Sequence, residues 1–121
     1  METPKIFESE YQLCRILWEN EPIKSRDLAA LCEEKLGWKK TTTYTVIKRL
    51  SDRGVLKNEN TVVSSLVSKD QVRSSDIDEM IEKRFDGSVP IFLAAFVDNR
   101  KLSETDLEEL QKIIDRARQD I

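Results

Sequence analysis

The sequence predicts a mainly α-helical fold with a small β-hairpin. In the first half of the chain, apolar residues recur at helical spacing in three stretches. Gly37 and Gly54 follow the second and third stretches, because glycine adopts the left-handed conformation of a helix end at little cost. Residues 55–57 and 61–67 then have the composition of two short strands, separated by the turn-tolerant Asn58-Glu59-Asn60. Helices followed by a hairpin in this order describe a winged helix-turn-helix.

Length and composition limit the function classes. A chain of 121 residues forms one modest domain, or one small domain with an appended helical arm. No apolar run approaches the roughly 18 to 20 residues that cross a bilayer, and the N-terminus lacks the features of a signal peptide. We therefore expect a cytoplasmic protein without direct membrane insertion. The chain has no histidine, and its two cysteines lack metal-type spacing, so we expect no metal, no cofactor and no enzymatic activity.

The first two helices have recognisable start signals. Ser9, followed three residues later by Gln12, predicts a capping box, and this helix should end near Glu19. Ser25 is expected to cap the second helix through its hydroxyl. The apolar face of that helix consists of Leu28, Leu31, Cys32 and Leu36. The two serines therefore define the expected starts of both helices.

The third helix, expected from about Lys40 to Arg53, has two faces of different chemistry. Apolar side chains at helical spacing form the face expected to point inward: Val46, Ile47 and Leu50. Hydroxyl and ammonium groups form the opposite stripe, which consists of Thr41, Tyr44, Thr45 and Lys48. A major groove admits one helix, and such side chains can reach its base edges and phosphates. The alternative is that this stripe is an ordinary solvent-exposed helix face without a binding partner.

The charge distribution supports a nucleic-acid partner although the formal net charge is −3. Residues 1–68 have a net charge of +1 and residues 69–121 a net charge of −4. Between Lys39 and Lys57, one acid, Asp52, accompanies six basic residues: Lys39, Lys40, Lys48, Arg49, Arg53 and Lys57. This segment is the concentrated positive patch of the sequence.

The acidic remainder predicts helices that pair with a second subunit, so we divide the chain into a DNA-binding domain over residues 1–68 and a helical dimerisation domain over residues 69–121. A fourth helix, with Ile77, Met80, Ile81 and Phe85 on one face, should stop near Gly87. Ser88 and Pro90 open a fifth, almost wholly apolar helix. Ser103 and Asp106 form a capping arrangement for the last helix, which continues with a heptad seam. The expected dimer contacts are Phe92, Leu93, Phe96, Val97, Leu107, Leu110 and Ile114. The alternative is burial of these side chains within one chain.

The run from Trp38 to Leu50, continuing to Gly54-Val55-Leu56, resembles the recognition helix of the penicillinase and methicillin-resistance repressors (BlaI/MecI type). The framework of this resemblance is Trp38, Thr42, Thr45, Arg49 and Leu50, and further matching pieces are Ser9-Glu10-Tyr11, Leu17-Trp18 and the stretch from Leu102 to Leu110. The resemblance spans nearly the whole chain. It implies a homodimeric transcriptional repressor whose two winged helices bind half-sites of palindromic, double-stranded operator DNA.

The resemblance also implies a means of induction. In that family a membrane-bound sensor protease can cut the dimerisation helix of the repressor, often between an asparagine and a phenylalanine. The matching position here is Ala95-Phe96, which lacks the asparagine. The C-terminal cysteine cluster of copper-responsive relatives is absent as well.

The expected DNA contacts divide by chemistry. Lys39, Lys40, Lys48 and Arg49 are assigned to phosphates, whereas Thr41, Thr42, Tyr44 and Thr45 are assigned to base edges. Tyr44 stands where relatives frequently have a basic residue, so the operator sequence should differ. The wing carries Val62, Val63 and the acidic Glu59, and we expect it to add little affinity.

Several features have alternative interpretations. The main rival is a winged-helix module that binds protein rather than DNA, and a regulator that responds to a small molecule is a third hypothesis. Trp18 and Trp38 are expected to pack at the core rather than to stack on bases. Cys14 and Cys32 are expected to act as small buried hydrophobes, with a redox sensor as the alternative.

Overall fold

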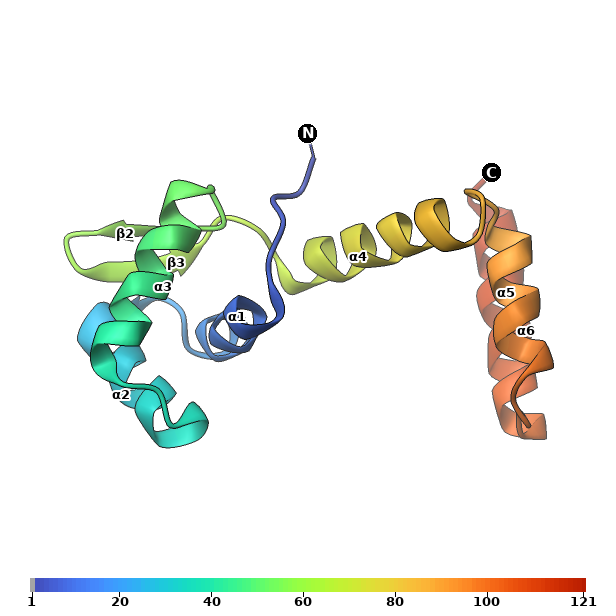
Figure 1. Ribbon diagram of the computed structural model, residues 1–121. Helices are drawn as coiled ribbons and strands as arrows, with labels where there is room; N and C mark the ends of the chain where they lie inside the picture. The colour runs from blue at the N-terminus through green and yellow to red at the C-terminus, as the bar shows by residue number, and fades with distance from the viewer. Residues whose placement is uncertain (1) are drawn as a thin grey trace. The chain divides into compact units, whose positions relative to one another are not determined.

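The computed structural model describes residues 2–121, which form two compact units (Figure 1). The first unit ends at Ile77, and the second comprises Asp78–Ile121. The division falls inside helix α4 (Lys69–Arg84), whereas the sequence-based boundary at residue 68 lies just before this helix. The described residues contain six helices and one three-stranded antiparallel sheet, which confirms the predicted fold class.

Three helices of the first unit form at the predicted places: α1 (Glu8–Asn20), α2 (Ser25–Leu36) and α3 (Lys40–Asp52). Gly37 ends α2 in the left-handed conformation, with φ of 70°, as its position predicted. The predicted caps of α1 and α2 are wrong. The N-cap of α1 is Phe7, whose amide donates to the Glu10 carboxylate at 2.9 Å, and Ser9 lies inside the first turn.

Ser25 is the first residue of α2, not its cap. Its amide donates to the Thr61 carbonyl at 2.8 Å, because strand β1 (Ile23–Lys24) leads directly into the helix and joins its start to the sheet. The N-cap position belongs to Lys24, which makes no side-chain cap. A strand of two residues leaves no periodic pattern, and β1 was therefore not predicted.

The sheet has the order β1-β3-β2 and contains the predicted hairpin, β2 (Leu56–Glu59) and β3 (Val62–Ser65). The predicted turn, Asn58-Glu59-Asn60, is wrong, because its first two residues belong to strand β2. Asn58 and Glu59 pair with Val63 and Val62 in the ladder, and the turn is Asn60-Thr61. Both turn residues have positive φ, 52° and 66°, which suits a two-residue connection between twisted strands.

The core of the first unit joins the three helices to the sheet. Its buried apolar side chains come from α1, α2, α3 and the hairpin segment: Leu13, Cys14, Ile16, Leu17, Leu28, Cys32, Val46, Ile47, Leu50, Val55, Leu56 and Val63. Trp18 and Trp38 pack against this cluster, which confirms their predicted packing role. The Trp18 indole also donates to the Val67 carbonyl at 3.0 Å, so it ties α1 to the end of the hairpin segment.

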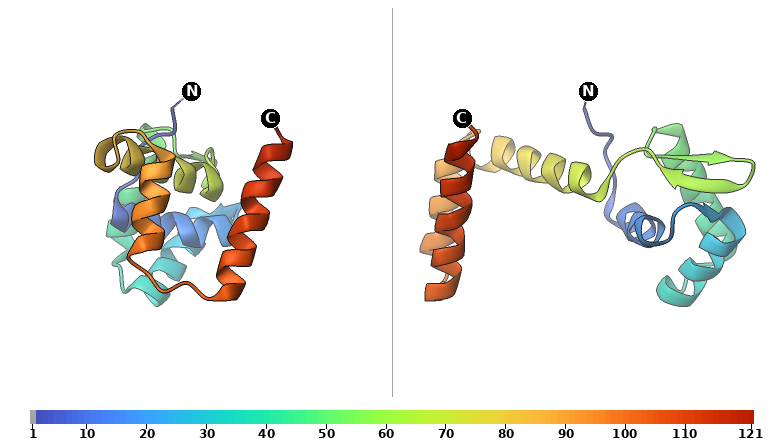
Figure 2. Two further views of the ribbon diagram at one scale, coloured as in Figure 1. Left: turned by 90° about the vertical axis from the view of Figure 1, so that its right-hand side faces the viewer. Right: turned by 180° about the vertical axis from the view of Figure 1, so that it is seen from behind.

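The second unit contains α5 (Val89–Asp98) and α6 (Glu104–Gln119), which run in opposite directions (Figure 2). Both predicted caps are confirmed. The Ser88 hydroxyl accepts from the Ile91 amide at 3.2 Å, and the Ser103 hydroxyl accepts from the Asp106 amide at 3.0 Å. Neither α5 nor α6, both fully described, contains a buried residue. Between residues 2 and 121, every helix is too short or too polar to cross a bilayer.

Candidate nucleic-acid interface

The outward face of α3 carries the polar side chains that the sequence assigned to DNA. Thr43, Val46, Ile47 and Leu50 are buried. The predicted contact residues are exposed: Lys39, Lys40, Thr41, Thr42, Tyr44, Thr45, Lys48 and Arg49. Tyr44 is the one large aromatic or aliphatic side chain of α3 that is exposed, at 44%. This helix therefore presents hydroxyl groups and cations, not an apolar docking stripe.

The N-terminus of α3 favours an anion. Lys39 occupies the N-cap position with extended backbone, and no side chain caps the helix there. The first turn contains no acidic residue. The free amides of a helix start carry partial positive charge, to which Lys39 and Lys40 add two full charges. A phosphate oxygen at this end would meet backbone and side-chain donors together.

Thr45 has a defined orientation on the exposed face. Its hydroxyl donates to the Thr41 carbonyl at 3.0 Å, one turn back along the helix. With that proton engaged, the oxygen offers acceptor lone pairs, and the methyl group remains as an apolar contact. Thr45 and Arg49 also line two shallow surface hollows. One, of about 240 Å³, is completed by Thr41, Thr42 and Val46, and the other, of about 350 Å³, by Tyr44, Lys48 and Asp52.

The structure divides the six basic residues of the positive patch. Lys39, Lys40 and Arg49 form no ion pair with any residue from 2 to 121. Lys48 lies 3.7 Å from Asp52, and Lys57 lies 3.7 Å from Glu59, in each case as an exposed pair. Exposed pairs contribute about 0 to 1 kcal/mol, so a phosphate can compete for either lysine. Arg53 differs, because its partner is buried.

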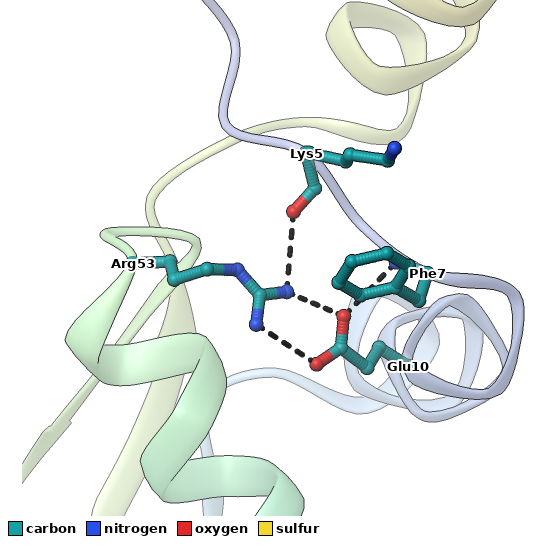
Figure 3. A network of polar contacts seen from close by, with 4 residues as sticks. All are labelled: Lys5, Phe7, Glu10 and Arg53. Carbon is teal, nitrogen blue, oxygen red and sulfur yellow. Dashed lines mark hydrogen bonds and ion pairs between the residues drawn. The ribbon is translucent and has the colours of Figure 1, made fainter.

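Arg53 and Glu10 form a network at the C-terminal end of α3 (Figure 3). One terminal nitrogen of Arg53 donates to Glu10 Oε2 at 3.0 Å, and the other donates to Glu10 Oε1 and to the Lys5 carbonyl, the latter at 3.1 Å. The Glu10 side chain is 6% exposed and that of Arg53 is 32% exposed. The guanidinium also lies 5.5 Å from the centre of the Phe7 ring.

This network was missed by sequence reasoning, which counted Arg53 in the positive patch without identifying a partner for it. Burial raises the pKa of Glu10, but the hydrogen bond and charge of Arg53, the Phe7 amide and the charge of Arg49 outweigh burial and lower it overall. A glutamate at the third position of the first turn was the available signal, since such a residue reaches back to the N-cap amide. The arginine partner, 43 residues away, leaves no local signal.

The cysteines lie in the core, as expected of small hydrophobes. Both are buried free thiols. Burial raises the pKa of Cys14 to about 12, with the negative charge of Glu10 adding to the effect. Burial also raises the pKa of Cys32, although the Thr43 hydroxyl opposes that rise. Because the thiolate is the reactive form, burial and the raised pKa values disfavour the reactive form of both thiols at neutral pH. Among the described residues, no cluster of three metal-ligating side chains occurs.

The predicted dimer contacts lie on α5 and α6. Phe92, Leu93, Val97 and Leu110 are half-buried, whereas Phe96, Leu107 and Ile114 are exposed. Three further large apolar side chains of these helices are exposed and were not predicted as contacts: Val89, Ile91 and Ile113. The Ala95-Phe96 bond lies within α5. The Asn99 amide group donates to the Ala95 carbonyl at 2.8 Å, and the Arg100 guanidinium lies 4.2 Å from the centre of the Phe96 ring.

Comparisons with known proteins place this geometry in a family. The penicillinase repressor family model matches residues 6–116. An uncharacterised 16.5 kDa protein of Latilactobacillus sakei is 30% identical over 93% of this chain and 80% of its own length. The methicillin resistance regulatory protein MecI of Mammaliicoccus sciuri is 24% identical over 94% of this chain and 96% of its own length.

Two solved structures share the fold of part of this chain. The DNA-binding domain of the repressor BlaI aligns with a TM-score of 0.50 at 20% identity, over 59% of this chain and 93% of that domain. Monomeric BlaI of Bacillus licheniformis in complex with the blaP half-operator aligns with a TM-score of 0.51 at 20% identity and the same coverage. Together with the family match over nearly the whole length, this winged-helix architecture shows that the chain belongs to the penicillinase repressor family of transcriptional regulators.

Proposed function

We propose that this repressor binds a palindromic operator as a homodimer, with α3 in the major groove of each half-site. The observation that carries the proposal is the composition of the exposed face of α3, where hydroxyl groups and cations replace the apolar anchors of a protein-docking surface. Monomeric BlaI, which shares the fold, binds a half-operator. Binding of one BlaI monomer to a half-operator supports the proposal that two winged helices of this protein bind a full operator made of two half-sites.

The contacts divide between positioning and reading. Lys39, Lys40, Lys48 and Arg49 bind phosphates, and the free amides at the start of α3 assist Lys39 and Lys40. Base edges are read by Thr41, Thr42, Tyr44 and Thr45. Thr45, whose proton is engaged with Thr41, offers an acceptor for an adenine or cytosine amino group and a methyl for thymine.

Dimerisation follows from the unburied apolar surface of the helical domain, residues 69–121. Phe96, Leu107 and Ile114 remain between 37% and 44% exposed. Large apolar side chains exposed in this number on two short helices favour an interface with another chain. A second copy supplies the matching surface, and two winged helices about one DNA turn apart then bind a palindrome more tightly than one.

Relief of repression occurs by cleavage at Ala95-Phe96, carried out by a membrane-bound sensor protease. Cleavage there separates Phe96 and all of α6 from the winged helix and so removes most of the dimer surface. The bond lies inside α5, and its carbonyl is held by Asn99, so the protease must unwind the helix locally before it cuts.

The test is selection of bound sequences from a random duplex pool, with the solution mass measured in parallel. We expect a palindrome with half-sites about 10 base pairs apart and a mass of twice the chain. Replacing Arg49 with glutamine should reduce the slope of log affinity against log salt by about one unit. Recovery of no sequence, together with unchanged salt dependence, would refute DNA binding by α3 and favour the protein-docking alternative.

A further inference from the structure

Arg53 is the cation of the positive patch that cannot turn toward DNA without breaking a buried contact. It lies at the C-cap of α3, one turn beyond Arg49. Its two terminal nitrogens make three hydrogen bonds, two to Glu10 and one to the Lys5 carbonyl (Figure 3). A paired guanidinium and carboxylate of this geometry is among the stronger polar contacts in proteins.

The burial of Glu10 makes the pairing obligatory. Glu10 is buried, and its carboxylate accepts from the Phe7 amide as well as from Arg53. If Arg53 moved to a phosphate, the Glu10 charge would stay buried with the Phe7 amide as its remaining donor. An uncompensated buried charge is far costlier than an exposed one. Lys48, whose partner Asp52 is exposed, has no comparable constraint.

The network joins the start of α1 and the residues just before it to the end of α3, which lies more than 40 positions later in the sequence. Lys5 and Phe7 belong to the segment before α1, Glu10 lies in the first turn of α1, and Arg53 closes α3. The packing of Val46, Ile47 and Leu50 fixes which face of α3 points outward. The Arg53 contacts add polar bonds to this packing at the end of the helix opposite Lys39 and Lys40.

We propose that Arg53 and Glu10 are positioning residues for DNA recognition: their ion pair holds the C-terminal end of α3 so that Thr41, Tyr44 and Thr45 meet the base edges in register, and Arg53 itself contacts no phosphate. The inference rests on the proposed function, that α3 binds DNA. Recognition sites need support of this kind because a displacement of about 1 Å degrades them.

The rival assignment, in which Arg53 contacts a phosphate, predicts the opposite change in operator affinity when Glu10 is replaced. If Glu10 merely competed with a phosphate for Arg53, then Glu10→Gln would release the cation, strengthen binding and steepen the salt dependence. A positioning pair predicts weaker operator binding with an unchanged salt slope. Arg53→Lys distinguishes them again, since it keeps the charge but cannot span both Glu10 oxygens and the Lys5 carbonyl.

The experiment uses the full chain and compares Glu10→Gln, Arg53→Lys, Arg53→Gln, the double variant Glu10→Gln/Arg53→Gln and the control Arg49→Gln. Affinity for the selected operator and for a scrambled duplex is measured at several salt concentrations. All measurements are made at a temperature where circular dichroism shows every variant folded. We expect each variant of the pair to lose about tenfold in operator affinity and less than about twofold for the scrambled duplex, with the salt slope unchanged. The double variant should be no weaker than the weaker single, because both remove one interaction.

A slope reduced by about one unit in Arg53→Gln, full affinity in Arg53→Lys, or tighter binding by Glu10→Gln would overturn the inference. The Arg49→Gln control separates this result from failure of the proposed function. If Arg49→Gln also leaves slope and affinity unchanged, then α3 is not the DNA-binding element. If Arg49→Gln reduces the slope while the pair variants bind both duplexes normally, the interface stands and the positioning role is wrong.

Discussion

The two units of the molecule differ in how far they bury their apolar side chains. In the first unit, Leu13, Leu28 and Leu50 are fully buried within one chain. In the second unit, α5 and α6 bury no residue, and large apolar side chains such as Ile91 and Ile113 are about half exposed. The first unit therefore has its own apolar core, whereas the apolar side chains of α5 and α6 stay partly exposed in the single chain, which is the surface that the proposed dimer would cover.

The largest expected effect comes from a core substitution in the first unit. Leu50→Ala removes a fully buried side chain from the inner face of α3. We expect it to lower the free energy of unfolding by about 2 to 5 kcal/mol, because it loses apolar burial and leaves a cavity. Urea denaturation followed by circular dichroism measures this change. The matched control, Leu66→Ala, alters a side chain that is 53% exposed and should change stability by less than about 0.5 kcal/mol.

The second prediction tests whether the exposed apolar surface of the second unit forms the dimer interface. Ile114→Asp places a charge on the exposed apolar face of α6, where the side chain is 41% exposed in the single chain. We expect dimerisation to weaken by about 2 kcal/mol or more, which sedimentation equilibrium would report as roughly a 30-fold rise in the dissociation constant. Thr105→Asp, also on the exposed surface of α6, is the matched control. If both variants remained fully dimeric, the α6 surface would not be the interface.

How far the sequence predicted the molecule can be judged from α3. Its apolar spacing predicted the buried face of Val46, Ile47 and Leu50, and the exposed stripe followed from it. The same reasoning grouped Arg53 with Lys39 and Arg49, because a count of charges along the chain contains no information on distant partners. Glu10 lies 43 positions earlier, and only the fold brings the two together. Local periodicity thus predicts which face of a helix is buried and which is exposed. An ion pair between distant segments becomes visible only in the folded structure.

A pH dependence tests that long-range pair within the first unit. The folded-state pKa of Glu10 lies below its ordinary value of 4.5, since the contacts to Arg53 and Phe7 outweigh the opposing effect of burial. The ionised form therefore stabilises the fold above pH 4.5, and this contribution is lost as the pH falls through 4.5 toward the lower folded-state value. Stability should decline more steeply in the wild type than in Glu10→Gln over this acidic range. Thermal unfolding at a series of pH values measures both slopes, and parallel curves would contradict the assignment to Glu10.

The smallest effect concerns helix caps, where sequence signals were equally clear at Ser9 and Ser103 but only one was correct. The Ser103 hydroxyl accepts from the Asp106 amide at 3.0 Å, whereas Ser9 lies inside α1 because Phe7 and Glu10 already define that helix start. Ser103→Ala should therefore cost about 1 kcal/mol of stability and Ser9→Ala only a few tenths, since a cap matters where the amide has no other partner. Denaturation of the two variants at equal protein concentration measures the difference. Equal losses would mean that the hydroxyls act through something other than capping, and a larger loss at Ser9 would contradict the Phe7 start of α1.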